Sequence, residues 1–161
     1  MPADIDVVDL KILGVLQRDA SLSTAEVAER VGLSQAPCWR RIQRLRDAGY
    51  IRATVILLDR HKLGFNLQIF AQLKMSRLND TARAELLRQI DSIPEILECY
   101  TVLGEIDMVM KVVVPDILWY QEFLVTVIMK LPGVRDVHSI VTLSEKKNTT
   151  VIPANTGLLG H

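Results

Sequence analysis

Residues 22–51 read LSTAEVAERVGLSQAPCWRRIQRLRDAGYI, and this stretch carries the strongest local signals in the chain. Ser23 followed by Glu26 matches a capping box, so we expect a helix to begin there and to end at Gly32. A second helix is expected over residues 35–48, directly after a short turn. Two helices joined by a short glycine-containing turn predict a helix-turn-helix.

The sequence on either side of this motif predicts one further helix before it and a mixture of strands and helices after it. Apolar residues at helical spacing over 7–16 add a helix before the motif, and the β-branched run 50–58 adds a strand after it. Further elements are expected as a strand at 67–75, a helix at 80–93, strands at 96–103 and 106–114, a helix at 117–131 and a strand at 137–143. This β-α-β-β-α-β order is typical of a ferredoxin-like sandwich.

The predicted fold class is therefore α+β, with a helix-turn-helix (winged-helix-like) head followed by a ferredoxin-like βαββαβ sandwich. The expected boundaries are 1–49 for the helix-turn-helix head, 50–62 for a linker strand and turn, 63–147 for the sandwich domain, and 148–161 for a C-terminal tail that lies on the surface or frays.

Basic charge concentrates at the expected recognition helix. The chain has a formal net charge of zero, yet residues 34–62 contain seven Lys or Arg residues and only two Asp or Glu residues. A helical wheel places Cys38, Ile42 and Leu45 toward the core and turns the remaining side chains outward. In a helix-turn-helix this second helix enters the major groove. The predicted DNA contacts are Ser34, Gln35, Ala36, Trp39, Arg40, Arg41, Gln43 and Arg44.

The residue types suggest different roles in such a contact. Gln35, Arg40 and Gln43 suit base edges, whereas Arg41 and Arg44 suit phosphates, which fix register without reading sequence. An arginine run is also common on a solvated helix face, and Trp39 taken alone favours half-buried packing over a contact to a sugar or a thymine methyl. Cys38 reads as a buried small hydrophobe. The position of the basic run on this one helix favours the DNA-binding interpretation.

Other classes of protein are disfavoured by composition and spacing. The chain has 161 residues, 49% of them hydrophobic, with two cysteines that form no zinc or disulfide motif. Neither a secretory signal nor an apolar run of membrane-spanning length is present, so the expected location is the cytoplasm. The three histidines lack partner ligands, and no phosphate loop or nucleophile motif is found. We therefore expect no enzyme activity, catalytic residue, metal or cofactor.

The motif 22–51 resembles the head of the leucine-responsive/AsnC (Lrp/AsnC) family of prokaryotic regulators. The segments LGEIDMVMKVVVPD (103–116) and LPGVRDVHSIVTL (131–143) resemble that family's effector-binding domain, and the likeness extends over about 6–147. It implies a transcriptional regulator that binds double-stranded DNA and forms homodimers through the sandwich domain. Tetramers or octamers, and an amino-acid effector bound between dimers, are implied as well.

The same resemblance assigns an effector loop. The family pattern Gly-Asp-x-Asp-Tyr corresponds to Gly104-Glu105-Ile106-Asp107-Met108, so the glycine and the second aspartate carry over while the tyrosine does not. The resemblance implies effector contacts from Gly104, Glu105, Asp107, Met108, Ile140, Val141 and Thr142. A plain hairpin turn at 104–105 and a surface ion pair at Asp107 are the simpler interpretations. An oligomeric ligand-binding module without DNA regulation is the alternative function.

Overall fold

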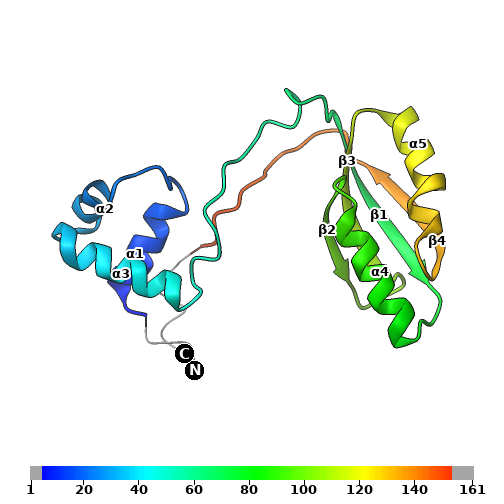
Figure 1. Cartoon of the computed structure of the whole chain (residues 1–161). Helices are drawn as coiled ribbons and strands as arrows, with labels where there is room; N and C mark the ends of the chain where they lie inside the picture. The colour runs from blue at the N-terminus through cyan, green and yellow to red at the C-terminus, as the bar shows by residue number, and fades with distance from the viewer. Residues whose placement is uncertain (1–4, 154–161) are drawn as a thin grey trace. The chain divides into compact units, whose positions relative to one another are not determined.

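The computed structural model describes residues 5–153, which form two compact units (Figure 1). One unit comprises the chain up to Leu57 together with the segment that begins at Lys147, and the other comprises Leu58–Lys146. The polypeptide therefore passes between the units twice.

The first unit is a three-helix head. Its helices are α1 (Val7–Leu16), α2 (Thr24–Val31) and α3 (Gln35–Asp47). The predicted capping box at Ser23 and Glu26 is present, and Gly32 ends α2 in the left-handed conformation. Ser34 precedes α3 but makes no side-chain cap hydrogen bond. The helix-turn-helix prediction is confirmed.

A small apolar core holds the three helices together. Its buried members are Ile12 of α1, Val27 and Ala28 of α2, and Cys38, Ile42 and Leu45 of α3. The inward face predicted for α3 is therefore correct. Since α3 buries this one stripe, its opposite side is left for contact with a partner.

The second unit is a four-stranded antiparallel sheet with two α-helices packed on one face. Its elements are β1 (Leu67–Met75), α4 (Asp80–Ser92), β2 (Ile96–Thr101), β3 (Met108–Val114), α5 (Ile117–Thr126), a 3-10 turn η1 (Ile128–Lys130) and β4 (Val134–Val141). The strand order is β2-β3-β1-β4, as expected for a ferredoxin-like sandwich. The long helix predicted over 117–131 is in fact broken into α5 and η1.

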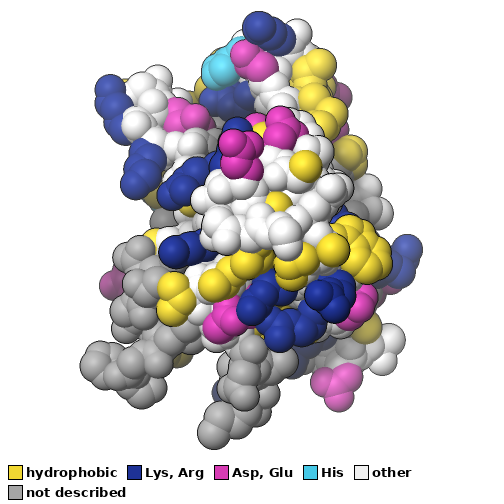
Figure 2. Space-filling model, turned by 90° about the vertical axis from the view of Figure 1, so that its left-hand side faces the viewer, with side chains coloured by type: hydrophobic (Ala, Val, Ile, Leu, Met, Phe, Trp, Pro, Cys, Tyr) yellow, Lys and Arg dark blue, Asp and Glu magenta, His cyan; other side chains and the backbone are white. Residues whose placement is uncertain are grey.

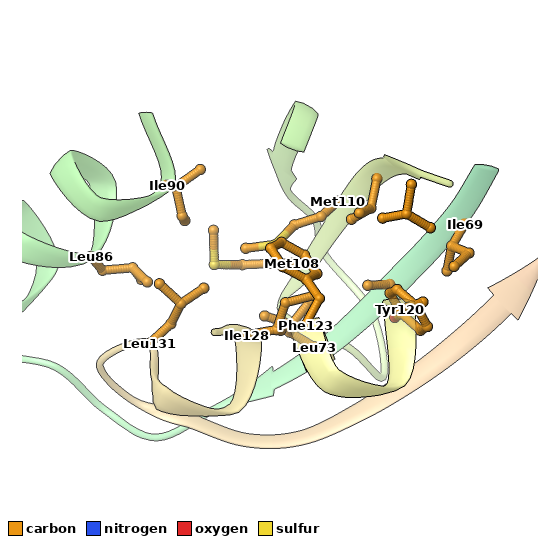
Figure 3. Close-up of a cluster of buried hydrophobic side chains, with 13 residues drawn as sticks. Ile69, Leu73, Leu86, Ile90, Met108, Met110, Tyr120, Phe123, Ile128 and Leu131 are labelled. Atoms are coloured by element: carbon orange, nitrogen blue, oxygen red, sulfur yellow. The ribbon is translucent and has the colours of Figure 1, made fainter. Parts of the chain in front are cut away.

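Alternate residues of the central strands form the core of this unit. Ile69 and Leu73 of β1 and Met108 and Met110 of β3 point toward α4 and α5, among the side chains that Figure 3 labels. The opposite face of the sheet carries Phe70, which pairs with Lys111 of β3 and Ile140 of β4. Neither α4 nor α5 covers that second face, because both pack on the first.

One predicted element is wrong for the single chain. The strand expected over 50–58 does not form, and residues 52–59 pair with no strand in the described part of the chain. A strand requires a hydrogen-bonding partner, which composition alone does not supply. Four consecutive apolar residues remain largely exposed there, namely Val55, Ile56, Leu57 and Leu58.

Candidate nucleic-acid interface and effector loop

Four of the predicted DNA contacts gather on the N-terminal half of α3. Gln35, Ala36, Trp39 and Arg40 line one shallow hollow, and all four are exposed. Trp39 has 54% of its surface accessible. Arg40 forms no ion pair within residues 5–153. This surface combines an aromatic ring, an amide and an unpaired guanidinium, the groups that stack on, or hydrogen-bond to, nucleobases.

The head presents basic and apolar side chains together. Figure 2 shows a band of hydrophobic side chains on the viewed face, with a group of Lys and Arg side chains directly below it. A duplex carries closely spaced phosphates, so a helix rich in arginine such as α3 is suited to it. Gln43 lies on the same helix but is half-buried.

Arg41 and Arg44 face α1. The Arg41 guanidinium donates from Nη1 to Asp6 Oδ2 at 2.7 Å and to Asp9 Oδ1 at 2.9 Å. Arg44 donates from Nη2 to the second carboxylate oxygen of Asp9. The Asp9 side chain is completely buried, whereas the side chains of Arg41 and Arg44 remain 30% and 54% exposed. Both arginines are thus partly neutralised before any DNA arrives.

The acidic pair also caps α1. The backbone N–H of Asp9 donates to Asp6 Oδ1 at 2.8 Å, and the N–H of Asp6 donates to Asp9 Oδ2 at 3.1 Å. The hydrogen bond that the Asp6 carboxyl accepts from the backbone of Asp9, followed by the one from Arg41, lowers the pKa of this carboxyl below its ordinary value. The hydrogen bonds that Arg41 donates to Asp9 and Asp6 raise the pKa of its own guanidinium, with the one to Asp9 as the largest cause.

Our sequence analysis missed this acidic pair. Two aspartates three residues apart before an apolar run are a capping-box pattern, which was available as a signal. Their pairing with arginines 32 to 35 positions away is tertiary and has no local signature.

The effector loop lies at one end of the sheet. Gly104 and Glu105 are exposed, and Asp107 anchors the loop to β1. The backbone N–H of Met75 donates to Asp107 Oδ2 at 2.7 Å, while the N–H of Asp107 donates to the carbonyl of Leu73 at 2.9 Å. The Asp107 carboxylate therefore has a structural hydrogen bond and remains open to solvent.

The other implied effector residues lie elsewhere. Met108 belongs to the core and is only 6% exposed, among the side chains of Figure 3. Val141 pairs with Ile69 at the far end of β1, four to six residues from the anchor of Asp107. At about 3.3 Å per residue, that separation is roughly 13–20 Å. One chain therefore does not bring the loop and the segment 140–142 together.

Two absences concern residues 5–153 only. None of the helices there combines the length and apolar character needed to cross a bilayer. That part of the chain also holds no group of three or more His, Cys, Asp or Glu side chains that is placed to bind a metal ion.

Comparison with known proteins gives consistent matches for both units. Residues 5–52 match the family model described as winged helix-turn-helix DNA-binding, and residues 68–152 match that of the Lrp/AsnC ligand binding domain. The chain is 35% identical to the DNA-binding transcriptional activator DecR of Escherichia coli K12, over 92% of this chain and 98% of the relative. It is 34% identical to the leucine-responsive regulatory protein of Salmonella typhimurium, with 91% and 89% covered.

Solved structures agree with these matches. The transcriptional regulator NMB0573 of Neisseria meningitidis, solved as a complex with L-Met, superposes with a TM-score of 0.91 at 34% identity, covering 94% of this chain and 98% of that one. An AsnC family transcriptional regulator of Agrobacterium tumefaciens gives a TM-score of 0.88 at 37% identity, with 92% and 97% covered. The likeness therefore extends through both units of the chain.

Proposed function

Because this chain belongs to the Lrp/AsnC family of DNA-binding transcriptional regulators, we propose that it reads operator DNA with the exposed N-terminal half of α3. The observation that carries this proposal is the hollow lined by Gln35, Ala36, Trp39 and Arg40. We propose that it acts in the cytoplasm, as a homodimer or larger assembly that responds to a small-molecule effector.

Each of the four residues of the hollow makes a different kind of contact in the major groove. Arg40 pairs through its free guanidinium with the O6 and N7 atoms of a guanine, and Gln35 pairs with an adenine. Trp39 and Ala36 supply apolar contact to a thymine methyl. Gln43, which is half-buried, contacts the groove from the edge of this surface.

Phosphates are met by the flanking groups. Ser34 makes no cap hydrogen bond, so its hydroxyl and the first amides of α3 are available to a phosphate. Arg44 keeps 54% of its side chain exposed and reaches a phosphate while Asp9 orients it. Arg41, which is less exposed and bound to both aspartates, acts chiefly by fixing α3 on α1.

A second copy of the chain completes the assembly. The exposed apolar run 55–58 is a strand sequence without a partner, and the sheet face that carries Phe70 and Ile140 is not covered by α4 or α5. Pairing of two linkers and two sheet faces would bury both surfaces. Analytical ultracentrifugation should show a dimer or larger species, and a monomer at micromolar concentration would contradict the assembly.

The effector proposed for the loop 104–107 is a free amino acid. Its α-ammonium group is complementary to the solvent-facing Asp107 carboxylate, and Gly104 and Glu105 form the exposed turn beside it. NMB0573, similar along nearly its whole length, was solved with L-Met. Since Ile140, Val141 and Thr142 lie at the other end of β1, they contribute only from another copy, and Met108 contributes its backbone.

Asp107→Asn separates charge from structure in this loop. The asparagine carbonyl still accepts the Met75 N–H, but it loses the negative charge that attracts an ammonium group. A thermal-shift screen of the twenty amino acids should find at least one that raises the apparent stability of the parent and not of the variant. No shift in the parent with any of them would refute the effector proposal.

The DNA proposal is tested by selecting duplexes that bind the protein from a random pool and footprinting the enriched sequences. The dimer should protect two half-sites about one helical turn, or about 34 Å, apart or a multiple of it. A pool that yields no enriched sequence would favour the alternative of an oligomeric ligand-binding module.

A further inference from the structure

The chain returns to the head after the last strand. Thr142 ends the sheet pairing by donating its backbone N–H and its Oγ1 hydroxyl to the Gln68 carbonyl, at 3.0 and 2.9 Å. Residues 147–153 belong to the compact unit of the head. The sequence alone predicted only a surface tail here.

Gln17 at the end of α1 holds this returning segment. Its side-chain Nε2 donates to the Ile152 carbonyl at 2.8 Å, and the Ile152 N–H donates to Gln17 Oε1 at 2.9 Å. A primary amide that donates to and accepts from the same residue's main chain mimics the hydrogen bonding of a neighbouring strand. Gln17 itself is half-buried, but both of these hydrogen bonds lie at an exposed position.

Side chains of the head form a hollow around the same segment. α1 contributes Leu10, Gly14 and Val15 to it, and the end of α2 contributes Val31. Val151 of the returning segment lines the hollow and is half-buried, whereas Ile152 is 74% exposed. Val151 therefore lies against the head next to the backbone hydrogen bonds of Ile152.

We propose that residues 147–153 form a strap that docks on α1 and attaches the DNA-binding head to the end of β4. Without it, the head is connected to the sheet only through residues 52–59, which form no strand in the described part of the chain. A second tether restricts the positions the head can reach and so favours DNA with correctly spaced half-sites. This last consequence rests on the proposed function, but the docking itself does not.

Residues 143–146 connect the strap to residues proposed to line the effector site. Ile140 and Val141 immediately precede Thr142, whose two hydrogen bonds hold the end of the sheet pairing. An effector bound against residues 140–142 would therefore act on the tether through residues 143–146. The effector would shift the equilibrium between the docked and the released strap if it bound one of these two states more tightly than the other.

Gln17→Ala tests the docking in the full-length protein. Alanine is a good helix former at this terminal position, so the variant should fold, while both hydrogen bonds to Ile152 are lost. Trypsin followed by mass spectrometry should release the peptide that follows Lys147 on the order of tenfold faster than from the parent. Lys11→Ala is the matched control, because Lys11 lines the same hollow without a hydrogen bond to the strap, and it should leave the rate unchanged.

One outcome would overturn the docking of the strap, and another would overturn the restraint that it places on the head. One is equal cleavage rates for parent and Gln17→Ala, together with equal hydrogen-exchange protection of the Ile152 amide. The other is a faster cleavage with no change in how affinity depends on half-site spacing, in Gln17→Ala and in a chain ending at Lys147. A chain ending at Pro153 is the control for truncation. If the parent itself binds no DNA, the proposed function fails while the cleavage result still decides the docking.

Discussion

Removing the Asp9 carboxylate is expected to destabilise the head and loosen the recognition helix. This fully buried group accepts hydrogen bonds from Arg41 and Arg44 of α3 and from the N–H of Asp6. It is therefore the electrostatic link between the first helix and the helix proposed to enter the groove.

The expected loss of stability depends on the charges of Arg41 and Arg44, which lose their partner when the Asp9 carboxylate is removed. Removing one partner of a buried ion pair costs about 3–5 kcal/mol when the remaining charge stays buried. Here the two arginines are 30% and 54% exposed and can rehydrate. We therefore expect Asp9→Ala to lower the free energy of unfolding by about 2–3 kcal/mol. Asp9→Asn keeps the shape and an acceptor, so its cost should be about 1–2 kcal/mol.

Urea unfolding in a Trp119→Phe background provides the measurement. Trp39 is then the sole tryptophan and reports on the head, because the second one belongs to α5. The unfolding free energies of Asp9→Ala, Arg44→Ala and the double variant should be non-additive, since the residues share one contact. Stability of Asp9→Ala within about 0.5 kcal/mol of the parent, the range of ordinary surface changes, would refute this account of the ion pairs.

Four further outcomes are expected. Gly133→Ala should lower stability by about 1–3 kcal/mol, because this residue has φ +80° and an added Cβ would lie 2.7 Å from Leu78; Gly14→Ala, which meets no atom within 4 Å, should instead raise stability by about 0.5–1 kcal/mol in the same denaturation assay. Because the pKa of Asp6 is lowered in the folded state, its ionisation stabilises the fold at pH values above its unfolded-state pKa of about 3.9, and this contribution should disappear as the pH falls through the lower folded-state pKa. Unfolding curves between pH 7 and 2 that show no such loss in the parent, compared with Asp6→Asn, would contradict it. Arg44→Ala should weaken binding to all duplexes similarly and reduce the slope of log affinity against log salt by about one, and an unchanged slope would remove Arg44 from the phosphate contacts.

Local signals sufficed for much of the fold. The capping box at Ser23 and the helix end at Gly32 follow from local capping signals, and the inward Cys38, Ile42 and Leu45 follow from helical periodicity. The structure confirms them. These features depend on neighbours within a turn or two, which is why a single sequence carries them.

What the sequence did not reveal depends on distant pairing. The residue types of Arg41 and Arg44 suggested phosphate contacts, but only the fold places them against Asp9. Strand register likewise decides that Val141 lies far from the loop at Asp107. The docking of the C-terminal segment on Gln17 spans 135 positions and has no periodic signature.

Binding of Arg40→Ala to a selected operator and to an unrelated duplex, at fixed moderate salt, tests the central claim most directly. Reading of a base edge by Arg40 predicts a loss of about 1–3 kcal/mol on the operator, relaxed preference at one base pair and little change on the unrelated duplex. Arg88→Ala, which removes an arginine of α4 from the other unit, should bind both like the parent. Parental affinity and specificity in Arg40→Ala would show that this face of α3 does not read DNA.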